Sequence, residues 1–416
     1  MSHACHEITP DLPCNLCGAA AATVLSERSR SGAYLRTVAC TGCGLVWSDP
    51  RPHDPRRFYT DAYRLEYKGT YAPRPKHVLR AGRVALSRLD KIRPFLRPGL
   101  RILDVGSGGG EFAYLLASLG HTVRGVEPNR GYATYAAAEY DLDIEVGFIG
   151  DIALQPESYD LITIWHVLEH TEDPGAVLRQ LREALRPGGV LVVEVPNVEA
   201  TCQWPASSFH EAHLFNFNAA TLGRLGARVG LTTAATTLAA DGGNLTMGFR
   251  AAPFTAATTP AAAALPGNHA RVAGVVSGHR ALAHALSLHP YRRFATRMAR
   301  KTDEWLRTRV RAPARQRLDR LYAPARAPSA ARPERRPLWQ YVAAAYAAAV
   351  VLEGLLLDTL VPQGTWSTVQ AMGLYLVLQT AAVGGIVWAT ERPRTVPQFA
   401  WLAAWAVPLF GLPAYC

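Results

Sequence analysis

The sequence has little of what marks a secreted protein. Its first fourteen residues, MSHACHEITPDLPC, lack an apolar run that could serve as a signal peptide, so we expect this end of the chain in the cytosol. Only seven cysteines occur in 416 residues, and four of them stand in two CxxC pairs near the N-terminus. Paired thiols at this spacing favour a metal in a reducing compartment over disulfides.

Lysine is also scarce, since nearly all the cations of this alanine-rich chain are arginines, a composition typical of a GC-rich genome. The net charge of +11 is uneven: residues 291–336 hold 15 Arg and Lys against four acids, and the rest of the chain is close to neutral. A stretch of this kind can face anionic lipid head groups or nucleic acid. The length and the 49% of hydrophobic residues suffice for two or three domains.

The two CxxC pairs are each followed by a glycine, Gly18 or Gly44, that relaxes the turn. Together they predict one closed, tetrahedral zinc site. Its ligands are Cys14, Cys17, Cys40 and Cys43. Two roles remain open: a staple for a small lobe with little core of its own, or a ribbon that contacts substrate or nucleic acid.

A glycine-rich turn follows the apolar run at residues 101–105, and a helical pattern follows the turn. The dinucleotide fingerprint lacks its last glycine, because position 111 is Glu. Asp104 just ahead of the turn would repel a diphosphate but can hold the ammonium group of S-adenosylmethionine, which we therefore predict as the cofactor. The predicted cofactor turn comprises Gly106, Ser107, Gly108 and Gly110.

Strand and helix patterns alternate through the middle of the chain. We expect strands at 101–105, 122–127, 144–147, 160–164 and 190–194, with helices near 110–119, 131–140 and 174–186. This alternation predicts an α/β fold with a Rossmann-like, doubly wound parallel sheet, closed by two antiparallel strands within 231–250. Ligand then binds at the carboxyl ends of the strands, where we expect Asp104, Glu127, Asp151 and His166.

Two of these acids have specific expected roles. Glu127 ends the second strand and can accept hydrogen bonds from both hydroxyls of a ribose. Asp151 can accept from the adenine amino group, or it can simply cap a turn.

Several motifs occur in a fixed order: CNLCG, CTGCGLVWSDPRP, LDVGSGGGEF, the Glu of VRGVEPN, SYDLITIWHVLEHTEDP, LRPGGVLVVEVPN and AHLFNF. In this order the chain resembles class I S-adenosylmethionine-dependent methyltransferases (type 11/23-like), specifically the group with an N-terminal zinc ribbon, over roughly residues 10 to 250. The resemblance implies a Rossmann-like methyltransferase fold, bound S-adenosylmethionine and a structural zinc ion.

The resemblance also implies candidate catalytic residues. Related ubiquinone-pathway O-methyltransferases carry ExxEH where this chain has His166, Glu169 and His170, and that segment can hold a divalent cation; the alternative is a salt-bridged helix start. Sugar C-methyltransferases with a similar lobe carry Tyr-x-Glu-His where this chain has His210, Ala212 and His213, so the methyl acceptor can be an oxygen or a carbon.

Methyl transfer to a hydroxyl needs alignment and removal of a proton. Histidine titrates near the working pH, so we expect the catalytic residues among His166, His170 and His213, with His210 nearby. His213 is the preferred general base; a buried, fully hydrogen-bonded histidine is the alternative.

Three apolar runs close the sequence. Residues 338–361 and 365–390 are each long enough to span a bilayer, and 399–416 spans or dips into it. Arginines flank the first two runs on the outside, which predicts a multi-pass protein of the cytoplasmic membrane whose catalytic domain faces the cytoplasm. The expected domains are a zinc-ribbon lobe (1–50), a linker and helical lid (51–98), the methyltransferase domain (99–253), a basic linker with helices (254–337) and two or three transmembrane helices (338–416).

The function we expect is S-adenosylmethionine-dependent methylation of an O or C atom by a membrane-anchored enzyme. Its partners would be the membrane and a small-molecule or lipid-linked acceptor, and nucleic acid is not expected. Two alternatives remain, an RNA methyltransferase and a non-catalytic membrane-bound scaffold that binds the cofactor. Tyrosines at every fourth position from Tyr59 to Tyr71 predict either an aromatic lid or the packed face of a helix.

Overall fold

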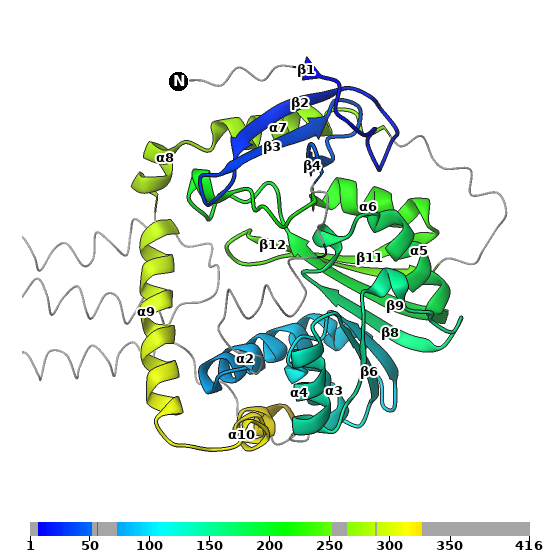
Figure 1. Cartoon of the computed structure of the whole chain (residues 1–416), viewed down its shortest axis with the longest axis vertical. Coiled ribbons are helices and arrows are strands. Elements are labelled where there is room, and N and C mark those ends of the chain that lie inside the picture. The colour runs from blue at the N-terminus through cyan, green and yellow to red at the C-terminus, as the bar shows by residue number, and fades with distance from the viewer. Residues whose placement is uncertain (1–6, 52–55, 57–72, 252–263, 288, 327–416) are drawn as a thin grey trace, which may run out of the picture. The chain divides into compact units, whose positions relative to one another are not determined.

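The structure is a computed structural model, and it describes residues 7–51, 56, 73–251, 264–287 and 289–326 (Figure 1). The expected tyrosine lid of residues 59–71 lies outside these residues, as do the three apolar runs after residue 337.

The larger of two sheets has seven strands in the order β11-β12-β9-β8-β5-β6-β7. The five from β9 to β7 are parallel, while β12 lies antiparallel to both β9 and β11. This confirms the predicted α/β, Rossmann-like sheet and its antiparallel closing pair. The bounds are β5 Arg101–Val105, β6 Thr122–Glu127, β7 Asp143–Val146, β8 Tyr159–Trp165, β9 Leu185–Pro196, β11 Leu231–Leu238 and β12 Asn244–Ala251.

Helices cover both faces of this sheet, because successive side chains of a buried strand point to opposite faces. In β5, Ile102 packs with the core under α2, α3 and α4, whereas Leu103 packs with the core under α5 and α6. Figure 1 shows the two groups of helices on either side of the sheet. Their bounds are α2 Pro75–Ile92, α3 Glu111–Ser118, α4 Arg130–Tyr140, α5 Pro174–Ala184 and α6 Ala219–Arg228.

Side-chain caps explain where three of these helices begin. The side chains of Asn129, Asp173 and Asn218 accept hydrogen bonds from the first turns of α4, α5 and α6. The predicted helix at 174–186 ends two residues early, at Ala184, because Leu185 pairs with Tyr159 of β8 and already belongs to β9.

The smaller sheet is antiparallel, with strand order β1-β2-β3-β4-β10. Four strands come from the N-terminal lobe, and the fifth comes from a segment more than 160 residues later, where Phe215 pairs with Trp47. The lobe is therefore completed by the segment that carries His210 and His213. The bounds are β1 Glu7–Ile8, β2 Ala22–Arg28, β3 Tyr34–Cys40, β4 Val46–Ser48 and β10 Phe215–Asn216.

The basic segment that follows the closing strands forms four helices: α7 Asn268–Gly278, α8 Ala281–Leu286, α9 His289–Thr308 and α10 Ala314–Arg326. Helices α7 and α8 are separated by a break at His279 and Arg280. Helix α7 packs on β2 and β3, α9 packs on α2, and α10 packs on α2, α3 and α4. The segment is thus part of the folded body.

Among the helices of the described residues, none is long and apolar enough to cross a membrane. This finding contradicts the predicted multi-pass localisation in the cytoplasmic membrane. The apolar runs on which that prediction depended lie outside the described residues, so the predicted membrane spans have no support in the structure.

Candidate functional site

A cavity of about 580 Å³ lies at the carboxyl ends of β5, β6 and β8. Its position follows from the strand order: β6 lies on one side of β5 and β8 on the other, so the connections diverge and leave a crevice. The cavity wall includes Gly106, Gly108, Glu127, Phe148, Ile149, Trp165, His166 and His170.

The glycine turn after β5 forms one wall of the cavity with its backbone. Gly106 and Gly108 have φ values of 73° and 57°, a region that glycine adopts at little cost. A Cβ atom on Gly106 would come within 2.3 Å of Cγ2 of Val167. Only glycine therefore allows this turn to lie so close to Val167.

Glu127, the last residue of β6, lines the cavity beside this turn and is only 3% exposed. Its carboxylate accepts from the backbone N–H of Gly108 at 2.8 Å and from that of Asn129 at 3.1 Å. These bonds fix the side chain, and each oxygen can accept a further hydrogen bond. The geometry suits the predicted contact with a ribose.

Asp104 lies elsewhere than the sequence predicted. It is 1% exposed, it is not part of the cavity wall, and its carboxylate accepts from Oγ1 of Thr163 at 2.7 Å. Burial raises the pKa of Asp104 to about 6. The sequence located the end of the strand, but it could not show that the last carboxylate is hydrogen-bonded to Thr163 of the neighbouring strand β8.

Three other residues predicted to bind the cofactor also lie outside the cavity wall. The side chain of Ser107 is buried. Gly110 precedes α3 and packs against Ala136. Asp151 is exposed and forms an ion pair with Arg56 at 2.8 Å, so it approaches the cavity only through that arginine, which does line the wall.

His166 follows β8 directly and has a left-handed backbone, with φ of 55°. Its Nδ1 lies 3.3 Å from Glu169 and its Nε2 lies 3.3 Å from Glu194. Burial alone would lower the pKa of His166, but the two carboxylates raise it to about 9. Both ring nitrogens are therefore occupied near neutral pH, and the histidine is a fixed cation, not the proton acceptor that the sequence predicted.

Glu194 and its partner Lys91 were not predicted as site residues. Glu194 lies near the carboxyl end of β9, is 4% exposed, and pairs with Lys91 of α2, with His166 and with Oγ1 of Thr246 at 2.6 Å. Burial disfavours its charge, yet these partners lower the pKa of Glu194 to about 2. The sequence signal was the single acid inside the apolar run VLVVEV.

Glu169 and His170 lie in a short 3₁₀ helix, η4 (Leu168–His170), and meet His213 from the later loop. Ligand atoms of the three residues lie within 4.8 Å of one another. Glu169 is 1% exposed, and Nδ1 of His166 lies 3.3 Å from one of its carboxylate oxygens. His170 Nδ1 donates to the carbonyl oxygen of Ala212 at 2.7 Å, and its Nε2 lies 3.8 Å from Glu169.

The histidines of the later loop are held without charge. Burial lowers the pKa of His213 to about 3 and that of His210 to about 4. The His213 ring lies 4.9 Å from the rings of both His170 and His210. Near neutral pH His213 therefore offers a lone pair to a cation or a proton. Burial disfavours the charge of Glu169, but the neighbouring His170 and His166 lower the pKa of Glu169 to about 2, so it supplies negative charge.

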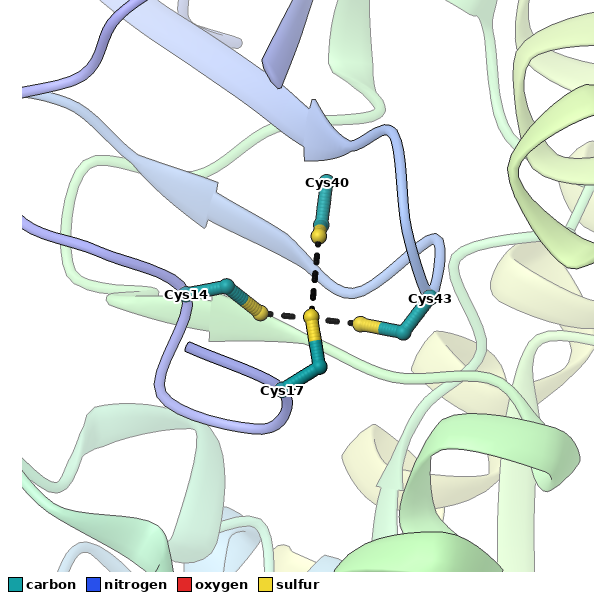
Figure 2. Close-up of side chains that lie close together, drawn as sticks. All are labelled: Cys14, Cys17, Cys40 and Cys43. Atoms are coloured by element: carbon teal, nitrogen blue, oxygen red, sulfur yellow. Dashed lines mark hydrogen bonds between the residues drawn. The ribbon is translucent and has the colours of Figure 1, made fainter. Parts of the chain in front are cut away.

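The four predicted zinc ligands converge in the N-terminal lobe (Figure 2). The Sγ atoms of Cys14 and Cys43 are 3.5 Å apart, and those of Cys17 and Cys40 are 3.3 Å apart. A tetrahedral ion with Zn–S bonds of about 2.3 Å requires sulfurs about 3.8 Å apart. The close sulfurs share their protons unequally, which lowers the pKa of Cys40 to about 2 and raises that of Cys43. The arrangement could hold one metal ion.

Two matching turns build this cluster. The N–H of Gly18 donates to the carbonyl of Cys14, and the N–H of Gly44 donates to that of Cys40, each at 2.8 Å. The φ values of the two glycines are 75° and 72°. Each CxxC pair therefore presents two sulfurs from one tight turn, as the following glycines predicted.

The lobe also holds the loop that carries His213. Oγ of Ser48 donates to the carbonyl of His213 at 2.9 Å, and the N–H of Ser48 donates to that of Leu214 at 3.1 Å. From the other side, Asn268 donates to the carbonyl of Cys43 and accepts from Asn218, both at 2.8 Å. The cysteine cluster thus lies in the framework that positions the loop beside Glu169.

Comparison with known proteins identifies the central region. Residues 77–236 match a family described as a methyltransferase domain. The chain is 34% identical over 143 residues to the ubiquinone biosynthesis O-methyltransferase of Azorhizobium caulinodans, covering 31% of this chain and 56% of that one. It is 31% identical over 161 residues to the corresponding enzyme of Caulobacter sp., covering 35% and 63%. The chain therefore spans about half to two thirds of the length of these relatives.

A solved structure, an S-adenosylmethionine-dependent methyltransferase from Mesorhizobium loti, aligns with 39% of this chain and 96% of its own, at 18% identity and a TM-score of 0.35. The sequence matches and the strand order agree that residues 77–236 form a class I S-adenosylmethionine-dependent methyltransferase domain. The predicted domain type is confirmed.

Proposed function

We propose that the chain transfers the methyl group of S-adenosylmethionine to a hydroxyl oxygen of a small molecule. One observation carries the proposal: a fixed, buried carboxylate, Glu127, shares the wall of a cavity with a glycine turn at the switch point of the sheet. The names of the similar proteins, ubiquinone biosynthesis O-methyltransferases, support oxygen as the acceptor atom.

The cavity offers a place for each part of the cofactor. Glu127 would accept from the ribose hydroxyls, while the backbone of Gly106 and Gly108 leaves room for the methionine part. Phe148 and Ile149 give the apolar wall that an adenine ring needs. Asp104 is buried and is not part of the cavity wall, so we assign it no direct contact with the cofactor.

In the reaction, the acceptor oxygen forms a bond to the methyl carbon as the bond from that carbon to the sulfonium sulfur breaks. The sulfur keeps the electron pair and becomes a neutral thioether, and the hydroxyl releases one proton to solvent water. His166 cannot take that proton near neutral pH, because Glu169 and Glu194 hold it charged. Its part is to fix the two carboxylates at the mouth of β8.

We also propose a divalent cation at Glu169, His170 and His213, in place of the general base predicted at His213. The observation that favours it is a fully buried carboxylate, Glu169, that lies within 4.8 Å of ring nitrogens of His170 and His213. Two imidazoles and one carboxylate suit zinc, iron or manganese better than magnesium. Such an ion would supply positive charge that lowers the pKa of an acceptor hydroxyl.

The four-cysteine cluster is proposed to hold a structural zinc ion. Its sulfurs lie close to the tetrahedral spacing, and Ser48 of the same lobe is hydrogen-bonded to the loop of His213. Zinc would then have no contact with the acceptor. It would stabilise the folded lobe and its fifth strand, β10, and so hold the loop of His213 in place.

The test is methyl transfer from isotopically labelled S-adenosylmethionine to a panel of small hydroxyl compounds, with catechol as the first probe. Mass spectrometry should find the label on an oxygen of the acceptor. Label on carbon would refute O-methylation. If the protein binds the cofactor but transfers label to no member of the panel and to no cell extract, a non-catalytic binding protein is the better description.

A further inference from the structure

The C-terminal helices expose a row of large apolar side chains that the fold leaves uncovered. Among the described residues, fourteen large hydrophobic side chains are exposed, and eight of these lie between residues 282 and 310. Such a concentration on one segment marks a surface for interaction. The eight are Leu282, Leu286, Tyr291, Phe294, Met298, Trp305, Leu306 and Val310, with exposures between 46% and 81%.

Four of these residues lie on one stripe of α9. Tyr291, Phe294, Met298 and Trp305 follow a spacing of three, four and seven residues, which returns to the same side of a helix. Helix α9 has 20 residues and is therefore about 30 Å long. The stripe runs along most of this length.

The charges of α9 are divided between two sides. Both acids face the folded body, where Asp303 pairs with Arg83 and Glu304 pairs with Arg80 at 2.7 Å. Glu304 is only 4% exposed. The acids of the helix are thus used for attachment to α2.

The cations beside the apolar stripe form no ion pairs within the described residues. Arg297 and Lys301 are exposed, lie on the flank of the stripe and form no ion pair with a described residue. The guanidinium of Arg309 lies 3.4 Å from the centre of the Trp305 ring, at the end of the stripe. The uncovered side of α9 therefore combines apolar side chains with unpaired positive charge.

From this arrangement we propose that the outer face of α8 and α9 lies flat on an anionic lipid surface. A helix of this type buries its apolar stripe at the boundary of head groups and acyl chains, while flanking arginines and lysines contact the anionic head groups. This contact is peripheral and requires no segment that crosses the bilayer.

Two other partners fit the face less well. A second copy of the chain would bring the same unpaired cations together, which repel. Single-stranded RNA could stack on Tyr291, Phe294 and Trp305, but the aliphatic side chains of Leu282 and Leu286 give it nothing to stack on. Lipid alone uses both the aliphatic and the aromatic members of the row.

The experiment is hydroxyl-radical footprinting of the full chain, read at Phe294, Met298 and Trp305 by mass spectrometry. Vesicles of phosphatidylglycerol should reduce oxidation at these residues, vesicles of phosphatidylcholine should not, and high salt should restore it. Because the reading is taken at single residues, binding through another part of the chain leaves it unchanged. It also requires no methyl transfer, so it can fail while the proposed function holds.

Variants sharpen the result. Replacing Arg297 and Lys301 by Gln should weaken vesicle binding through this face by about fivefold per cation, roughly 25-fold together. Trp305→Glu should abolish the protection of Met298. The matched controls are Arg179→Gln, on the exposed side of α5, and Leu238→Glu, at a residue 53% exposed on β11, and neither should change the reading.

Three results would overturn the proposal. The first is oxidation at Met298 and Trp305 that phosphatidylglycerol vesicles leave unchanged. The second is protection that rises with protein concentration in the absence of vesicles, which would indicate a second copy. The third is protection by polyuridine RNA but not by vesicles.

Discussion

The buried carboxylate of Glu169 gives the most specific prediction about the site. If Glu169, His170 and His213 bind a divalent cation, Glu169→Gln should abolish that binding, because a neutral amide at 1% exposure supplies no charge to balance the ion. The suitable probe is Mn²⁺, since manganese prefers carboxylate and imidazole and binds thiolates poorly, so the cysteine cluster should not respond.

The expected size follows from ligand linkage. At a Mn²⁺ concentration about 100 times the dissociation constant, binding stabilises the folded protein by about 2.7 kcal/mol. For a domain of this size, each kcal/mol raises Tm by about 2–4 °C, so wild type should gain about 5–10 °C. Each protein is compared with itself without Mn²⁺, so a change in baseline stability does not enter the result.

The assay is thermal unfolding with and without Mn²⁺ for wild type, Glu169→Gln and a control, Glu172→Gln. Glu172 lies three residues away but is 53% exposed and pairs with Arg56, so its variant should keep the full shift. An unchanged Tm in wild type, or an equal shift in Glu169→Gln, would refute the reasoning.

Three further predictions test the rest of the framework. Lys91→Met should destabilise the fold by about 1.5–3 kcal/mol in urea unfolding, because it removes one of the two cations that neutralise the buried Glu194 and leaves only His166. The pKa of Glu194 is lowered from 4.5 to about 2, so its stabilisation is present above pH 4.5 and the difference between Lys91→Met and wild type should shrink as the pH falls toward 2; a constant difference would contradict this. Cys43→Ser should lower zinc content in elemental analysis and melt the lobe first in hydrogen exchange, unlike Cys202→Ser, which lies outside the cluster. Gly106→Ala should lose cofactor binding in equilibrium dialysis, because its Cβ would collide with Val167, whereas Gly99→Ala meets no neighbour and should retain it.

The sequence predicted the sheet well, because the strands carry continuous apolar runs whose side chains are buried on both faces. β5 and β6 were located to the residue, and the antiparallel pair β11 and β12 also followed from its turn. A run of Val, Ile and Leu ended by glycine is a local sequence pattern, and such a pattern predicts a strand without knowledge of contacts with distant segments.

What the sequence did not give depends on contacts between distant segments. The pairing of Phe215 with Trp47 joins two segments more than 160 residues apart and completes the sheet of the lobe. No local sequence pattern predicts this pairing. Asp104 shows the limit at a single residue: its position at the end of β5 was predicted, but the hydrogen bond to Thr163 on the next strand decides that it faces inward.

The protonation states of the histidines also could not be predicted from the sequence. His166 was predicted to accept a proton. Its ion pairs with Glu169 and Glu194 form only because η4 and β9 lie next to each other in the folded chain. The burial of His213 against His170 is likewise a property of the assembled loop.

The central claim is that the cavity beside Glu127 receives S-adenosylmethionine, and isothermal calorimetry tests it most directly. Wild type should bind the cofactor, and Glu127→Ala should weaken binding about 10- to 100-fold, the worth of hydrogen bonds to a charged group. Glu183→Ala, an exposed acid on α5, should bind like wild type. Absence of binding in wild type, or equal binding in Glu127→Ala, would contradict the account.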